Sequence, residues 1–437
     1  MEDNTVVSID PYSKKVSCIE RYEHDRLYIG ENGFGKNHWD AFVRLNSIHE
    51  GKYFKVLPNG LKFKQYVGVL QVGNIVVQIN PKADKDDDNG HWHGVLLQML
   101  KACRRLKAQT AGNATVRKQN INLLEVYFEH FLREMEILVR HGLVKRYRKE
   151  TGNVKALKGK LDFAGNIRHN LVHKERFYTV HQVYDVNHKL HQVLAFALKI
   201  VDDFTAGTQL NDLCKRVRMG FPEVDKIQIN EQVLNSIKLD RKTAGYERAF
   251  ELARLIILHY SPDISGGKEK MIALLFDMNQ LWEEYIRVKL ASHLQDHPEI
   301  GLQLVTDNKT FWGSNYLKPD IVLQSKTETY IIDTKWKRPD RPSIHDLRQM
   351  YAYARFWKAK HVMLLYPGTQ CDSELNRFET DDYWMDKTMG VAEAKEMQHC
   401  CTMGFISVLN APKVLDDGIG SKVMELMGFG VKEVLNK

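Results

Sequence analysis

The chain has 437 residues, of which 43% are hydrophobic and 27% charged, and its formal net charge is +8 at pH 7. Length and composition indicate a globular protein of two or three domains with a sizeable core. No run approaches the ~18 apolar residues of a membrane span, the N-terminus lacks a signal-peptide pattern, and the six cysteines form no CxxC pair, so we expect a cytoplasmic protein with reduced thiols.

Residues 1–110 are expected to form a β-rich N-terminal domain. Short β-like runs alternate there with Gly and Asn turns, at residues 26–29, 52–57, 63–72 and 75–79. An acidic stretch at residues 84–89 ends this pattern, and a helix is predicted over residues 95–106.

One glycine-rich loop in this region could be either a nucleotide-binding loop or a hairpin loop. Residues 30–36 match the G-x-x-x-x-G-K half of a Walker A loop, but Asn37 replaces the Ser or Thr whose hydroxyl would hold Mg²⁺. No apolar strand ending in an acid follows as a metal-binding partner. A hairpin loop is therefore favoured over a nucleotide site.

Residues 111–265 are predicted to be a mainly helical middle region. Apolar residues recur every three or four positions over residues 120–144, and further helices are expected over residues 188–204, 210–220 and 244–259. Basic clusters occur near Arg105, Arg146 and Arg216. They are compatible with a polyanionic partner or with solvated helix faces.

Residues 266–437 are predicted to form an α/β domain. A boundary is expected at residues 261–268, followed by a long helix over residues 269–294. Strands are predicted at residues 302–311, 318–324, 329–335 and 362–366, with a helix over residues 343–358 before the last. The resulting order is α-β-β-β-α-β.

Two of these strands carry a pattern with chemical meaning. Pro319-Asp320 opens one apolar run, and Asp333-Thr334-Lys335 closes the next, so the pair is predicted to form a β-hairpin. Side chains alternate along a strand, which places Asp333 and Lys335 on one face. Carboxylates hold Mg²⁺ for phosphodiester hydrolysis, and an ammonium group orients water or phosphate. These residue types and this spacing are those of a PD-(D/E)xK nuclease site, the alternative being a solvated polar hairpin.

Neighbouring helices supply candidate supporting residues. Gln349 and Tyr353 are four positions apart and share one helix face, an arrangement that resembles the RecB-like branch of such nucleases. Glu283, beside an apolar stripe on the preceding helix, is the choice for a third metal-binding carboxylate over Glu284, the alternative being an exposed acid.

Segments along most of the chain resemble the McrC family, the nuclease subunit of McrBC-type restriction systems. The resemblance rests on residues 68–82 (GVLQVGNIVVQINPK), 158–167 (KGKLDFAGNI), 275–285 (LFDMNQLWEEY), 318–323 (KPDIVL), 332–337 (IDTKWK) and 346–353 (DLRQMYAY). The stretch at residues 371–400 has no obvious counterpart in the family pattern.

The resemblance implies a Mg²⁺-dependent endonuclease subunit that cuts double-stranded, modified DNA. It also implies an McrB-like AAA+ GTPase hexamer as partner, bound and stimulated through the N-terminal region, with GTP on the partner and not on this chain. The alternatives are a self-sufficient PD-(D/E)xK nuclease and a non-catalytic, DNA-binding activator of the GTPase.

Overall fold

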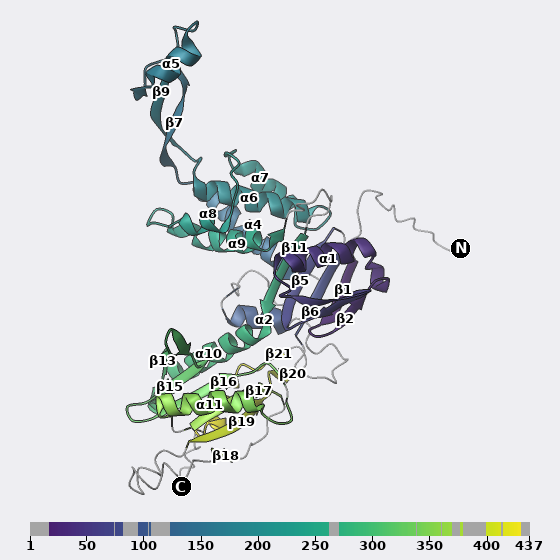
Figure 1. Ribbon diagram of the computed structural model, residues 1–437. Helices are drawn as coiled ribbons and strands as arrows, with labels where there is room; N and C mark the ends of the chain where they lie inside the picture. Colours follow the sequence, from purple (N-terminus) through teal and green to yellow (C-terminus); the bar gives the residue numbers. More distant parts are fainter. Residues whose placement is uncertain are drawn as a thin grey trace, which may run out of the picture. The chain divides into compact units, whose positions relative to one another are not determined.

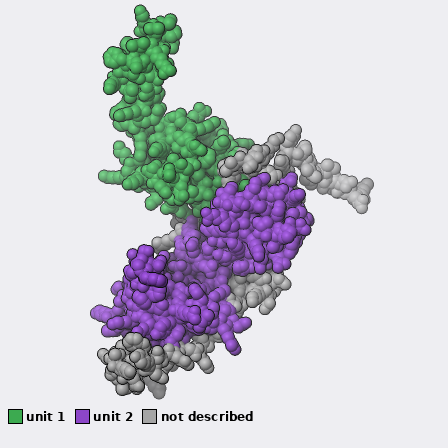
Figure 2. Space-filling model, viewed as in Figure 1, with its two compact units in different colours: residues 1–17, 69–76, 110–274 green, residues 18–68, 77–109, 275–437 purple. Residues whose placement is uncertain are grey.

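A computed structural model describes residues 17–73, 75–81, 95–103, 105, 123–261, 271–337, 339–359, 361–368, 376–378, 399–411 and 414–429 (Figure 1). The chain is a mixed α+β protein, as predicted, and it forms two compact units (Figure 2). Unit 1 comprises residues 1–17, 69–76 and 110–274, and unit 2 comprises residues 18–68, 77–109 and 275–437. The predicted three-domain division at residues 110 and 265 stays a prediction. Over the ranges given above, no helix combines the length and apolar character needed to cross a membrane.

The N-terminal elements confirm the predicted β-rich character. They are β1 (Ser17–Tyr22), β2 (Arg26–Tyr28), α1 (Lys36–Ile48), β3 (Phe54–Leu57), β4 (Gly60–Phe63), β5 (Tyr66–Val72), β6 (Ile75–Asn80) and α2 (Val95–Ala102). Strands β2, β4 and β3 form an antiparallel sheet. A second sheet has the order β1-β6-β5-β11-β10, in which β10 is Tyr260–Ser261 and β11 is Met271–Asp277. The run predicted over residues 63–72 is divided between β4 and β5.

The glycine-rich loop is not the hairpin loop that the sequence suggested. It leads from β2 through a short 3-10 turn, η1 (Glu31–Gly33), into helix α1. The backbone N–H of Gly35 donates to Nδ1 of His38, which caps the helix start. Phe34 and Phe42 are fully buried. Burial of this apolar face compensates for a weak helix propensity, because most helical stability in proteins comes from tertiary packing.

Unit 1 contains most of the predicted helices. The predicted ones are α4 (Leu123–His141), α6 (Lys189–Thr205), α7 (Asn211–Gly220) and α9 (Glu247–Leu258). A short helix between the last two, α8 (Glu231–Ser236), was not predicted. Helices α4, α6, α7 and α9 contact one another and form a helical body. Its apolar faces follow the three- and four-residue spacing seen in the sequence.

The described residues of the middle region are mainly helical, but a long arm that the sequence did not predict interrupts the helices. Strand β7 (Arg146–Val154) pairs antiparallel with β9 (Phe177–Asp185) along its whole length, and β8 (Lys160–Leu161) and α5 (Phe163–Asn170) lie at the outer end. Figure 1 shows the arm extending away from the helices of unit 1. Strand β7 carries few apolar residues, and in β9 they occupy both sets of alternate positions, so hydrophobic patterning gave no clear strand signal.

The base of the arm is fixed by buried polar contacts. The backbone N–H of Val144 donates to the Tyr246 hydroxyl at 2.9 Å, and His188 Nε2 lies 2.9 Å from the Val144 carbonyl. His191 contacts the Val186 carbonyl through Nδ1 and the Tyr246 hydroxyl through Nε2. Burial lowers the pKa of His191 to about 4. The chain entering the arm and the chain leaving it are therefore held by one neutral network.

The helix predicted over residues 269–294 begins later than expected. Residues Met271–Asp277 form strand β11, and α10 (Met278–Asp296) follows at once. Asp277 accepts a hydrogen bond from the Asn279 N–H and caps α10. The six apolar residues before Asp277 are all buried, as in a strand covered on both faces. A short, continuous apolar run of this kind fits a strand as well as a helix, which explains the error.

The C-terminal part of unit 2 contains a six-stranded mixed sheet of order β12-β15-β16-β17-β19-β18. Its strands are β12 (Gln303–Val305), β15 (Ile321–Gln324), β16 (Thr329–Thr334), β17 (His361–Pro367), β18 (Asn376–Arg377) and β19 (Cys400–Ile406). Helix α11 (Ile344–Trp357) connects β16 to the parallel strand β17 and packs on one face through Met350, Tyr353 and Trp357. Helices α10 and α14 (Ile419–Leu426) contact each other and touch β16 and β19 respectively.

The predicted α-β-β-β-α-β order is confirmed with one addition. The strand expected over residues 302–311 is two elements, β12 and the first strand of a separate ribbon, β13 (Lys309–Trp312) with β14 (Asn315–Leu317). Of the stretch at residues 371–400, residues 371–375 and 379–398 lie outside the described part of the chain.

Candidate active site

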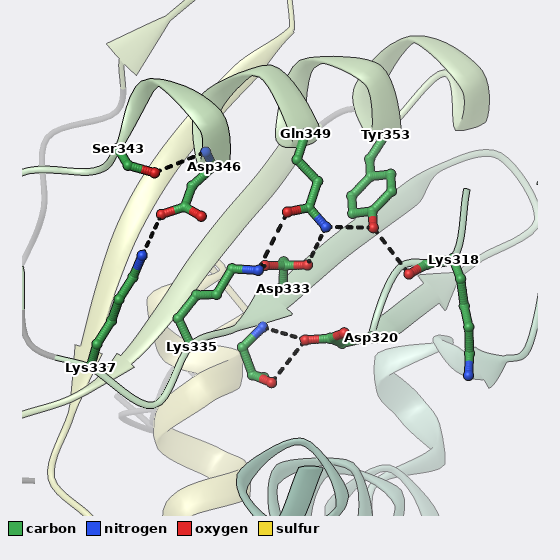
Figure 3. A network of polar contacts seen from close by, with 10 residues as sticks. Lys318, Asp320, Asp333, Lys335, Lys337, Ser343, Asp346, Gln349 and Tyr353 are labelled. Carbon is green, nitrogen blue, oxygen red and sulfur yellow. Dashed lines mark hydrogen bonds and ion pairs between the residues drawn. The ribbon is translucent and has the colours of Figure 1, made fainter. Parts of the chain in front are cut away.

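The β15–β16 hairpin brings the two predicted aspartates together. Ile321 pairs with Ile332 in an antiparallel register, so the next pair outward is Asp320 with Asp333. Directly opposed residues of an antiparallel pair project on the same face. The hairpin register therefore places both carboxylates at one end of the sheet, as Figure 3 shows.

Asp320 is fixed by the strand that carries Asp333. One of its carboxylate oxygens, Oδ2, accepts from the backbone N–H of Thr334 at 2.8 Å and from the Thr334 hydroxyl at 2.9 Å. Two donors on one oxygen leave little rotational freedom to the carboxylate. Thr334, which lies between Asp333 and Lys335, thus holds the Asp320 carboxylate in position.

Lys335 points back to Asp333, as predicted. Its Nζ lies 2.7 Å from Asp333 Oδ2, although the strand ends at Thr334. The backbone N–H of Lys335 donates to the Leu365 carbonyl at 2.9 Å. This bond continues the pairing with β17 beyond the strand end and sets the direction of the lysine.

Gln349 and Tyr353 on α11 complete the cluster. Gln349 Nε2 donates to the Tyr353 hydroxyl at 2.7 Å and makes a longer contact of 3.4 Å with Asp333 Oδ1. Gln349 Oε1 is 3.4 Å from Lys335 Nζ. The Tyr353 hydroxyl donates to the Lys318 carbonyl at 3.0 Å, so α11 is tied to both ends of the motif (Figure 3). We call Asp320, Asp333, Lys335, Gln349 and Tyr353 the acid–lysine cluster.

Burial sets the electrostatics of the cluster. The Asp333 side chain is 1% exposed, and burial together with the Asp320 charge raises its pKa to about 6, against the opposing effect of Lys335. Burial alone would lower the pKa of Lys335, but Asp333 outweighs it and the pKa rises, so the ammonium stays charged. Burial and the Asp320 charge also raise the pKa of Glu283. The Asp320 charge thus disfavours ionisation of both Asp333 and Glu283.

A second polar pair flanks the cluster and was not predicted. The backbone N–H of Asp346, at the start of α11, donates to the Ser343 hydroxyl oxygen at 3.1 Å. The Asp346 carboxylate pairs with Lys337 Nζ at 2.7 Å. Burial opposes ionisation of Asp346, but Lys337 and Ser343 prevail and lower its pKa. The Asp-x-x-Gln spacing to Gln349 places both on one helix face and could have indicated this residue.

Trp336 was also not predicted to belong to the site, and it supports the cluster from below. Its indole N–H donates to Glu23 Oε1 at 2.6 Å, and its ring meets that of Trp282 edge-on, with centroids 5.4 Å apart. Glu23 and Trp282 are both buried. Trp336 follows Lys335 directly and Trp282 precedes Glu283, so this contact supports two candidate site residues at once. No local sequence signal joins positions 23 and 336.

The donors fit a magnesium ion that shares its coordination with a substrate. Over the described ranges, no group of three or more His, Cys, Asp or Glu side chains is arranged to hold a metal on its own. Mg²⁺ is commonly bound through one or two carboxylates together with water and substrate phosphates. Asp320 and Asp333 supply two carboxylates, and the raised pKa of Asp333 marks a surplus of negative charge that a cation would relieve.

Fold and site define a mixed-sheet protein with an acid–lysine cluster at the end of a β-hairpin. The chain belongs to the family of McrBC 5-methylcytosine restriction system components, whose model matches residues 61–367. It is thus a subunit of a McrBC-type system.

Comparison with solved structures agrees with the family at the level of the fold. A chain of the refined half-complex from a tetradecameric assembly of Thermococcus gammatolerans McrB AAA+ hexamers with bound McrC superposes with a TM-score of 0.64 and 20% identity, over 92% of this chain and 98% of that chain. A chain of the Thermococcus gammatolerans McrBC complex gives a TM-score of 0.48 and 23% identity, over 64% of this chain and 88% of that chain. No curated protein sequence matches the chain.

Proposed function

We propose that the chain is the DNA-cutting subunit of a McrBC-type, modification-dependent restriction system and hydrolyses phosphodiester bonds with Mg²⁺. The observation that carries the proposal is the opposition of Asp320 and Asp333, with Lys335 Nζ 2.7 Å from Asp333. This C-terminal part is then a PD-(D/E)xK domain of the RecB-like kind. Double-stranded DNA is the proposed substrate.

Each residue has a distinct role in this proposal. Asp320 and Asp333 would hold Mg²⁺ together with water and substrate phosphate, with Glu283 as a neighbouring carboxylate that acts on Asp320 electrostatically. The bound ion would activate water and stabilise the leaving oxygen. Lys335, kept charged by Asp333, donates to the attacking water or to a phosphate oxygen. Gln349 contacts both Lys335 and Asp333 and orients their side chains, and the Tyr353 hydroxyl accepts from Gln349 and orients it in turn. Water adds to phosphorus, the bond to the leaving oxygen breaks, and that oxygen takes up a proton.

The direct test replaces Asp333 with Asn, which keeps shape and removes the charge. We expect Asp333→Asn to abolish cutting of modified DNA in the presence of the McrB-type GTPase while assembly with that GTPase persists. The matched control is Asp417→Asn, since the Asp417 side chain is 94% exposed and pairs with Lys289. Retained cutting by Asp333→Asn would defeat the proposal. Cutting by the purified chain without the GTPase would favour a self-sufficient nuclease instead.

A non-catalytic activator is the remaining alternative. A fold that only binds DNA has no chemical need for two opposed carboxylates beside a charged lysine, and their mutual repulsion costs stability. The geometry therefore favours an active centre over a relic.

The contact with an McrB-type AAA+ GTPase is proposed to lie on the arm of unit 1, in addition to or in place of the N-terminal region expected from sequence. Phe163, Ile167 and Leu171 are spaced by four residues along α5 and just beyond it, and all are largely exposed. We call these three residues the arm-tip surface. An apolar helix stripe without cover is a typical partner site. In residues 17–73, by contrast, the exposed large apolar side chains are the scattered Tyr28, Ile48 and Val56.

One pair of variants decides between the two regions. Phe163→Asp places a charge in the arm-tip surface, and Ile48→Asp does the same at a comparably exposed N-terminal position. If the arm binds the partner, Phe163→Asp lowers stimulation of GTP hydrolysis at least ~30-fold, as expected for loss of a central apolar contact. Ile48→Asp should then leave stimulation intact. The reverse result would return the partner contact to the N-terminal region.

A further inference from the structure

The β13–β14 ribbon exposes aromatic rings that the proposed chemistry does not use. Trp312 is 78% exposed, and Phe311 and Tyr316 are also more exposed than buried. Tryptophan is usually well buried in folded proteins, so a tryptophan this accessible is informative. Figure 1 places the ribbon beside β15 and α10, within the C-terminal part of unit 2.

The ribbon is short, tightly turned and anchored only at its base. Trp312 pairs with Asn315 across a two-residue turn in which Gly313 has φ +59°, a left-handed conformation that suits glycine. A bulge at Phe311 separates the pairs made by Thr310 and Trp312. β-Bulges redirect side chains and are frequent next to active sites. Trp312 therefore sits at the tip of a rigid turn.

The anchor is the C-terminal end of α11. Phe311 contacts the Phe356 ring with centroids 5.7 Å apart. Lys309 donates to the Phe356 carbonyl at 2.8 Å and lies over the Trp357 ring at 4.9 Å. The same helix carries Gln349 and Tyr353, so the ribbon and the acid–lysine cluster share one support.

The ribbon also leads directly into the acid–lysine cluster. Trp312 pairs with Asn315, which precedes Asp320 by five residues, so an extended chain and one cross-strand step separate Trp312 from Asp320 by at most about 22 Å. Successive bases of a DNA strand are about 3.4 Å apart, so the ribbon reaches about six base steps from the cut. Lys318, between ribbon and cluster, is exposed, and it and Arg287 both act on Glu283 electrostatically. These cations favour a polyanion at this end of the site.

We propose that the β13–β14 ribbon inserts Trp312 against a base of the DNA within about six steps of the cut phosphate. The inference rests on the proposed nuclease function and adds a base-contacting element to it. In a duplex both faces of a base are covered, so the ring partly unstacks two neighbouring bases as it enters. Stacking on the opened face has no sequence preference, because every base has a π face. The ribbon thus holds the duplex in place beside the acid–lysine cluster while the choice of target is made elsewhere.

The experiment uses the full chain assembled with its McrB-type GTPase and duplexes carrying 2-aminopurine at each of the steps flanking the cut. In the cutting-deficient Asp333→Asn background, binding should raise the fluorescence at one or two steps. Adding Trp312→Ala should remove that rise, and Trp312→Phe should largely keep it. With Asp333 intact, Trp312→Ala should slow cutting about tenfold or more. Met219→Ala, at an exposed site in unit 1, is the control for surface changes.

The outcomes separate the ribbon from the nuclease proposal. If the wild-type complex does not cut, the proposed function fails and the inference fails with it. If cutting is normal, and neither rate nor fluorescence responds to Trp312→Ala, the ribbon proposal alone is wrong. Loss of GTPase stimulation with unchanged DNA binding would assign the ribbon to the protein partner, and a change in sedimentation would assign it to a second copy of this chain; either overturns the inference.

Discussion

The arm and the acid–lysine cluster use opposite physical arrangements. The arm leaves apolar side chains in water at the outer end of a two-stranded ribbon, whereas the cluster buries charged groups beneath α11. Exposed apolar area lowers its free energy when a partner covers it, and crowded acids lower theirs when a cation joins them. Each region therefore raises the free energy of the isolated chain, and a specific partner would lower it.

The largest expected effect concerns the lysine of the cluster. Lys335→Met removes the ammonium and leaves Asp333 without its ion-pair partner, so we expect the rate of DNA cutting to fall about 10²–10³-fold. Stimulation of the partner GTPase, which we assign to the arm, should not change. Lys326→Met, in the exposed turn of the same hairpin, is the matched control and should cut normally. A simultaneous loss of GTPase stimulation would show that the two regions are not separable.

The buried acid predicts a pH dependence for cutting. The pKa of Asp333 is raised to about 6, so below that pH the carboxyl takes up a proton and loses its ability to hold a cation. The rate should fall about tenfold per pH unit below the midpoint. Mg²⁺ binds only the ionised form, so more Mg²⁺ should move the midpoint to lower pH. Rates measured against pH at two Mg²⁺ concentrations test this, and a midpoint that ignores Mg²⁺ would contradict it.

A smaller effect is expected from the support beneath the cluster. Trp336→Phe keeps the ring contact with Trp282 but removes the donor to Glu23, a loss of about 1–3 kcal/mol in the free energy of unfolding. We expect cutting to weaken several-fold at low Mg²⁺ and recover at high Mg²⁺, because Lys335 and Glu283 are displaced rather than removed. Glu23→Gln retains an acceptor and should cut normally. If high Mg²⁺ does not restore the cutting rate of Trp336→Phe, Trp336 has a role other than positioning Lys335 and Glu283.

The smallest effect belongs to the base of the arm. Tyr246→Phe removes the hydroxyl shared by Val144 and His191, and we expect a loss of about 1 kcal/mol in stability. Stimulation of the GTPase should drop only a few-fold, since the arm-tip surface itself is intact. Hydrogen exchange at the Val144 amide, which should become faster, is the direct readout. Unchanged exchange would mean that other contacts hold the arm.

The elements of the C-terminal part were largely predictable because their signals are local. One apolar run that begins after Asp320 and another that ends at Asp333 defined the hairpin, and the four-residue spacing of Gln349 and Tyr353 defined a helix face. The arm was not predictable in the same way. Strand β7 has few apolar residues, and the buried residues of β9, Thr179 and His181, are polar. Hydrophobic periodicity could therefore not detect the pairing.

The sequence by itself determined the reacting groups of the proposed site and their approximate order, because a strand period and a helix turn fix which neighbours share a face. Only the tertiary structure decided what surrounds them. It joined Asp320 to Thr334 and Trp336 to Glu23 by hydrogen bonds, and it packed the aromatic ribbon against Phe356. No local pattern relates these positions. Burial depth was also undecided, and with it the raised pKa of Asp333, because the local dielectric depends on every element packed around the charge.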